Sequence, residues 1–113
     1  MFKLDIEEMR RSASEATALL RALAHEDRLL LLCQLSQVEL CVGDIEEKLQ
    51  IRQPTLSQQL GILRREGLVE TRREGRNIYY RVADQRALGL LKTLYELYCA
   101  PAKAAAAKQG GRQ

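Results

Sequence analysis

Apolar residues recur every three or four positions along the first half of the chain, which is the spacing of amphipathic helices. Between residues 5 and 24 this pattern predicts one long helix, and residues 26–36 form a second, more strongly apolar one. A third helix is expected to open at residues 41–44 and to run to Gln50, with Gly43 or Asp44 as its cap.

A fourth helix is predicted after a short loop at residues 50–53. Its apolar positions are spaced i, i+4, i+7 and predict one buried stripe, formed by Leu56, Leu60 and Leu63. Pro54 suits the first turn of this helix, where a missing N–H has no cost, and Gly67 suits the position just beyond its end. Most polar side chains of the helix therefore face outwards, with Gln59 at the edge of the stripe.

Two strands and a last helix complete the pattern. Residues 69–72 and 77–82 are strand-like, and Glu74-Gly75 supplies a turn between them. Asp84 is expected to cap a final helix that ends before Pro101. The order ααααββα predicts a mainly α fold with a small β hairpin, a winged helix-turn-helix. We expect one domain over residues 1–101 and a flexible basic tail over residues 102–113.

Positive charge is concentrated in the fourth helix and the hairpin. Residues 1–51 hold 6 Lys/Arg against 10 Asp/Glu, residues 52–81 hold 7 against 3, and residues 82–113 hold 5 against 2. By itself this excess fits a solvated basic face as well as a nucleic-acid surface. The character of the adjoining helix favours nucleic acid.

The fourth helix carries uncharged side chains that both donate and accept hydrogen bonds, as readers of base edges in the DNA major groove must. The candidate base readers are Gln53, Thr55, Ser57, Gln58 and Gln59. The candidate phosphate contacts are Arg65, Arg72, Arg73 and Arg76. A reader helix beside a basic hairpin predicts a protein that binds double-stranded DNA.

The first and last helices carry apolar faces that nothing else in the chain is positioned to cover. A domain of this size would also gain stability from a partner subunit. We therefore predict a homodimer that packs through these two helices across a twofold axis. Such a dimer would place two reader helices about 34 Å apart, which predicts a palindromic operator.

Other classes of protein find little support in the sequence. No apolar run approaches the roughly 18–20 residues that span a bilayer, and the N-terminal segment lacks a signal peptide's apolar centre. Three cysteines, an odd number, favour free thiols in a reducing cytoplasm. Without a Cys-x-x-Cys motif, a phosphate-binding glycine loop or a nucleophile elbow, we expect no enzyme and no cofactor. A winged helix that contacts only proteins is the alternative, and salt-dependent DNA binding separates the two.

From about residue 12 to residue 100 the chain resembles the ArsR-type family of small dimeric bacterial repressors. The matching segments are LLRALAHEDRLLLLCQL, ELCVGDIEEKL and QPTLSQQLGILRREGLVETRREGRNIYYRV. Family members commonly have His where Gln59 stands here, a difference that concerns operator preference and not the fold. Within the family, the likeness is greatest to the dithiol-sensing members, typified by the biofilm growth-associated and HlyU regulators.

Those members carry one cysteine late in the second helix and another at the end of the last, matched here by Cys33 and Cys99. Taken singly, each thiol is as well explained as a small buried apolar residue. For the two cysteines taken as a pair, the resemblance implies that they are sensor thiols for reactive sulfur species or oxidants. A disulfide, which needs Cα atoms about 4.4–6.8 Å apart, or a longer sulfur bridge would then displace the reader helix.

Cys41 offers a second possibility. It lies in ELCVGD, which resembles the metalloid-binding ELCVCD element of other ArsR-type repressors, with Gly43 in place of the second cysteine. A lone thiolate binds soft ions weakly. The alternative function is therefore a metalloid- or soft-metal-responsive repressor with a three-thiolate site of Cys33, Cys41 and Cys99.

Overall fold

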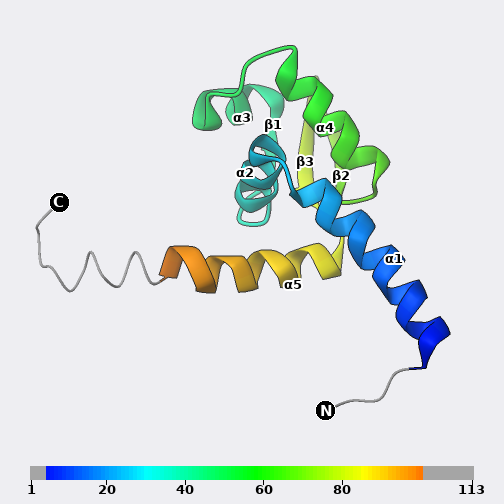
Figure 1. The fold of residues 1–113 in the computed structure, drawn as a ribbon. Helices are drawn as coiled ribbons and strands as arrows, with labels where there is room; N and C mark the ends of the chain where they lie inside the picture. The colour runs from blue at the N-terminus through cyan, green and yellow to red at the C-terminus, as the bar shows by residue number, and fades with distance from the viewer. Residues whose placement is uncertain (1–4, 101–113) are drawn as a thin grey trace, which may run out of the picture.

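A computed structural model describes residues 5–100 (Figure 1). The helices are α1 (Ile6–Leu23), α2 (Glu26–Leu35), α3 (Val42–Leu49), α4 (Thr55–Arg65), α5 (Gln85–Leu94) and a π-helical turn, η1 (Tyr95–Cys99). The strands are β1 (Leu40–Cys41), β2 (Val69–Glu74) and β3 (Asn77–Val82). The predicted winged-helix fold, mainly α with a small β hairpin, is confirmed. The predicted tail at residues 102–113 lies outside the described residues.

Aspartate side chains cap the starts of α1 and α5. Asp5 accepts a hydrogen bond from the Glu8 N–H at the start of α1, and Asp84 accepts one from the Ala87 N–H at the start of α5, as predicted. The predicted span of α3 is confirmed, but its predicted cap, Gly43 or Asp44, is wrong, because the helix begins at Val42 with Cys41 in the cap position. Cys41 also pairs with β3, and its extended backbone leads directly into the helix.

The three strands form an antiparallel sheet in the order β1-β3-β2. In the hairpin, Thr71 pairs with Tyr80 and Glu74 pairs with Asn77. The turn therefore consists of Gly75 and Arg76, one residue later than predicted, and Gly75 adopts the positive φ of 64° that favours glycine. The sequence did not predict β1, because two residues are too short to show a period of two.

The core lies between α2, α3, α4 and the sheet (Figure 1). Its fully buried side chains are Leu31, Leu32, Ile45, Leu56, Leu60 and Leu63, which include the whole predicted stripe of α4. Truncating one such leucine to alanine typically costs about 2–5 kcal/mol. This packing fixes α4 against α2 and turns its other faces outwards.

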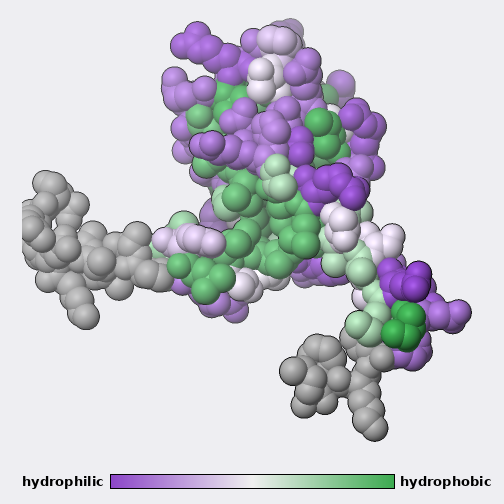
Figure 2. Space-filling model, viewed as in Figure 1, coloured by the Kyte–Doolittle hydropathy of each residue, from purple (hydrophilic) through white to green (hydrophobic). Residues whose placement is uncertain are grey.

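α1 and α5 diverge from the core (Figure 1). Large apolar side chains stand exposed on α1 and on η1, which follows α5 directly. They are Ile6, Met9 and Leu20 on α1, and Tyr95, Leu97 and Tyr98 on η1. Figure 2 shows hydrophobic surface gathered where α5 meets the core. Within residues 5–100, no helix combines the length and the apolar character needed to cross a membrane.

Candidate DNA-binding surface and thiol pair

The outer side of α4 presents two of the predicted base readers. Ser57 and Gln58 are exposed, and Thr55 is half-buried at the first position of the helix. These side chains stand opposite the leucine stripe, because successive residues turn by about 100° around a helix. The structure therefore leaves their hydroxyl and amide groups accessible.

Gln53 and Ser57 are joined across the start of α4. The Gln53 Oε1 accepts from the Ser57 backbone N–H at 3.1 Å and from the Ser57 hydroxyl at 2.6 Å. Gln53 thus satisfies a donor of the first turn, which Pro54 in the cap position does not do. The Gln53 N–H groups and the Ser57 lone pairs remain available to a ligand.

Gln59 does not belong to this outer surface. Its side chain is 9% exposed, and its Oε1 accepts from the Arg28 Nη1 at 2.9 Å. The prediction that Gln59 reads bases therefore disagrees with the structure. Gln59 stands three residues after Leu56 and four before Leu63, which places it on the buried side. That spacing is the signal in the sequence that indicates the burial of Gln59.

Arg72, a predicted phosphate contact, forms salt bridges with two nearby carboxylates. Its Nε donates to Glu39 Oε1 at 2.9 Å and its Nη1 to Glu74 Oε1 at 3.2 Å. Its Cζ also lies 4.8 Å from the centre of the Tyr79 ring. The hydrogen bonds to Glu39 and Glu74 raise the pKa of the Arg72 guanidinium above its ordinary value. Its charge is therefore compensated locally, which argues against its role as a phosphate contact.

The other wing arginines differ in their partners. Arg81 pairs with Glu70 across the hairpin. Arg73, Arg76 and Arg65 are exposed, and none of them makes a salt bridge to any residue between 5 and 100. Arg76 lies in the hairpin turn itself. The uncompensated positive charge near the reader helix therefore includes these three residues, together with the exposed Arg52 and Arg64, which also make no salt bridge within residues 5–100.

The two predicted sensor thiols lie on α2 and on the last helical turn. Both cysteines are free and exposed, Cys33 on α2 and Cys99 at the end of η1. Partial burial raises the pKa of the Cys33 thiol, and the charge of Cys99 raises that pKa further. The structure thus brings two thiols that are 66 positions apart in the sequence into electrostatic range of each other.

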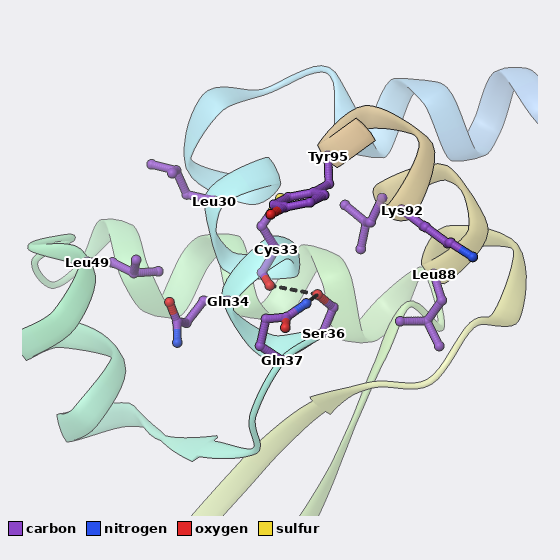
Figure 3. Close-up of a pocket in the computed structure, with 10 residues that line it drawn as sticks. Leu30, Cys33, Gln34, Ser36, Gln37, Leu49, Leu88, Lys92 and Tyr95 are labelled. Atoms are coloured by element: carbon purple, nitrogen blue, oxygen red, sulfur yellow. Dashed lines mark hydrogen bonds between the residues drawn. The ribbon is translucent and has the colours of Figure 1, made fainter. Parts of the chain in front are cut away.

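Cys33 also lines an apolar groove of about 780 Å³ between α2 and α5. Figure 3 shows the Tyr95 ring lying over Cys33, with Leu88 and Lys92 of α5 on the same side. The Cys33 carbonyl accepts from the Ser36 hydroxyl at 2.7 Å. The thiol therefore sits where the second and last helices meet, as its predicted role requires.

Cys41 is separate from this pair. Its thiol donates to Asp44 Oδ2 at 3.4 Å at the start of α3. Among residues 5–100, no group of three or more His, Cys, Asp or Glu side chains is placed to hold a metal ion. The three-thiolate site of Cys33, Cys41 and Cys99 is therefore not formed.

A polar-faced helix packed on two others and followed by an antiparallel wing defines the winged-helix class of DNA-binding transcriptional regulators. The family model described as bacterial regulatory protein, arsR family, matches residues 25–71. The biofilm growth-associated repressor of Agrobacterium fabrum is 54% identical over 93 residues, which cover 82% of this chain and 80% of that protein. The chain belongs to the arsR family and is a DNA-binding transcriptional regulator of the repressor type.

Two solved structures share the fold. The transcriptional repressor BigR from Xylella fastidiosa superposes with a TM-score of 0.78 at 45% identity, over 86% of this chain and 99% of that one. Reduced HlyU from Vibrio cholerae superposes with a TM-score of 0.80 at 39% identity, over 83% of this chain and 99% of that one. The similarity therefore extends beyond the helix-turn-helix to α1 and α5.

Proposed function

We propose that this regulator is a homodimeric repressor that acts in the cytoplasm, where it binds a palindromic operator in double-stranded DNA. Modification of the Cys33/Cys99 pair by reactive sulfur species or oxidants releases the operator. The observation that carries the proposal is the pair of free, exposed thiols, with Cys33 on α2 in the groove beside α5 and Cys99 at the end of η1. α2 packs on the reader helix through the core, so this pair lies one helix away from the DNA surface.

In the DNA-bound state, α4 enters the major groove. Thr55, Ser57 and Gln58 contact base edges, and the Gln53 N–H groups add donors at the start of the helix. The phosphate contacts come from three predicted arginines that make no salt bridge within residues 5–100, which are Arg65, Arg73 and Arg76. Base readers thus confer sequence preference, whereas the arginines confer salt-dependent affinity.

A second copy of the chain covers the exposed apolar faces of α1 and of the α5–η1 segment. Large apolar side chains stand 46–72% exposed there, for example at Met9 and Tyr98. Burying one such side chain contributes about 1.5–3 kcal/mol. A twofold dimer formed in this way presents its two α4 helices to successive major grooves.

The chemical step begins with one thiolate. Partial burial raises the pKa of the Cys33 thiol and so disfavours its thiolate, and we therefore assign the first attack to the exposed Cys99 at the end of η1. Attack on a polysulfide transfers one sulfur atom, giving a Cys99 persulfide and a polysulfide shorter by one sulfur. Cys33 then attacks the inner sulfur, forming a disulfide and releasing hydrogen sulfide. With a peroxide, a sulfenic acid and water replace the persulfide and hydrogen sulfide.

The bridge changes operator affinity by tying η1 to α2. The two helices then lose their independent movement, and the packing of α2 on α4 passes the displacement to the reader helix. To take the operator from almost full to almost empty, the modification must favour the non-binding conformation by about 5.5 kcal/mol. This requirement sets the size of the effect to be measured.

Titration of operator binding before and after polysulfide treatment tests the proposal. The operator is first recovered by selecting bound duplexes from a random pool. We expect treatment to lower the affinity of the wild-type protein and of Cys41→Ser, which keeps the pair, but not that of Cys33→Ser. Mass spectrometry distinguishes added sulfur, loss of two hydrogens and bound metal. Equal affinity before and after treatment of the wild type would refute the switch.

A further inference from the structure

Arg28 of α2 connects the end of α1 to the reader helix. Its Nε donates to the Ala22 carbonyl at 2.6 Å, and its Nη2 donates to the Arg21 carbonyl at 3.2 Å. Its Nη1 donates to Gln59 Oε1 at 2.9 Å. One guanidinium therefore spans three helices, because its donors diverge in a rigid fork.

The two carbonyl contacts lie in the last turn of α1. The Arg21 carbonyl also accepts from the Ala24 N–H at 3.3 Å, whereas among the described residues only Arg28 donates to the Ala22 carbonyl. The end of a helix carries partial negative charge. A cation is therefore favourable at this position, and Arg28 also satisfies the Ala22 carbonyl, which α1 leaves open. Within residues 5–100 Arg28 forms no salt bridge, so its orientation depends on these neutral acceptors.

The third contact fixes the rotation of α4. Gln59 is the one buried polar side chain among the described residues, and it directly follows the exposed Ser57 and Gln58. Each residue turns the helix by about 100°, so the direction in which Gln59 is held determines the direction in which Gln58 points. The buried leucine stripe already sets which side of α4 faces the core, and a hydrogen bond to a charged group adds a directional contact at Gln59.

We propose that Arg28 is a positioning residue that sets the rotation of the reader helix relative to the end of α1. Gln59 is the hydrogen-bond acceptor on the reader helix. This inference rests on the proposed DNA surface of α4. Arg28 and Gln59 touch no bases, so they act equally on every operator sequence. Because α1 belongs to the proposed dimer interface, Arg28 also couples the geometry of the dimer to the reader helix.

A double-mutant cycle tests the proposal on the full chain with its selected operator. Arg28→Lys keeps the charge but cannot span three acceptors, and Gln59→Leu keeps the volume but removes the acceptor. Each change is expected to lower operator affinity about tenfold, and the double variant should lose no more than the larger single loss. Arg11→Ala, which removes an exposed charge from α1 and leaves the three contacts intact, serves as the control and should keep the wild-type affinity.

Two further measurements separate positioning from folding and from base reading. Stoichiometric titration gives the active fraction, and positioning requires a weaker Kd at an unchanged active fraction. Competition with single-base operator variants should show unchanged base preferences for Gln59→Leu. The proposal would be overturned if Gln59→Leu changed the preference at one base, or if the variants lowered only the active fraction. It would also be overturned if the affinity loss of the double variant equalled the product of the two single losses. If Gln58→Ala also left affinity and preference unchanged, the proposed DNA surface itself would be wrong.

Discussion

Three consecutive polar residues of the reader helix have different surroundings although their side chains are chemically similar. Ser57 and Gln58 are exposed, whereas Gln59 is buried and accepts a hydrogen bond from Arg28. The difference comes from their angle to the leucine stripe and not from their chemistry. The wing arginines differ in the same way, since Arg72 is held by Glu39 and Arg76 is not.

Replacing Gln58 with alanine should relax base preference at one operator position. The amide can donate and accept towards a base edge, and its loss should cost about 1–3 kcal/mol against that base alone. Competition with single-base operator variants measures this pattern. An affinity loss spread evenly over all variants would contradict a base-reading role for Gln58.

Replacing Arg76 with alanine should weaken binding to every duplex and lower the slope of log affinity against log salt by about one. Arg72→Ala is the matched control, because Glu39 and Glu74 already compensate the charge of Arg72. We expect a smaller change in salt slope for that variant. Equal slopes for the two variants would show that local compensation does not decide which arginines meet phosphate.

The pKa of Cys33 predicts a pH dependence of its reactivity. Its pKa is raised by partial burial and by the charge of Cys99, so its alkylation rate should rise with pH to a midpoint above the roughly 8.5 of an ordinary thiol. Cys99→Ser removes a neighbouring negative charge and should lower this midpoint. Iodoacetamide labelling, followed by mass spectrometry of the Cys33 peptide, measures both effects. A midpoint at or below the ordinary value would contradict the partial burial of this thiol.

The sequence pattern predicts the helices directly, but it does not predict the short strand β1 or the exact position of the hairpin turn. α1, α2, α4 and α5 have long periodic runs or clear caps, and their predicted bounds lie close to those observed. β1 consists of two residues that are strand-like only because β3 pairs with them. An element held by pairing cannot be predicted from its own residues.

The terminal helices predict an oligomer. Tyr98 of η1 is 72% exposed, and Tyr98→Glu would place a charge in the proposed interface. The change should weaken self-association by about 1.5–3 kcal/mol, which is comparable to the loss of one buried aromatic side chain. Val38→Glu is the control, since Val38 is also an exposed apolar residue but lies outside α1 and α5. Sedimentation equilibrium compares the two variants. Equal dimer stability would place the interface elsewhere.

For the whole molecule, α2 connects the proposed parts. Its Cys33 lies on the side that faces α5, and its Arg28 contacts the last turn of α1. Its core leucines pack on α4. A covalent tie at the thiols and a displacement of the dimer helix would therefore reach the reader helix through the same element. This arrangement explains how a helix that touches no DNA could control operator binding.

The sequence by itself determined the order of the helices, the wing, the leucine stripe of α4 and the family, because periodicity and motifs are properties of neighbouring residues. Only the tertiary structure decided which polar groups are free. The partners of Gln59 and Arg72 lie 31 and 33 positions away, at Arg28 and Glu39. Contacts over such distances depend on how the helices and the sheet pack, and no local pattern records that packing.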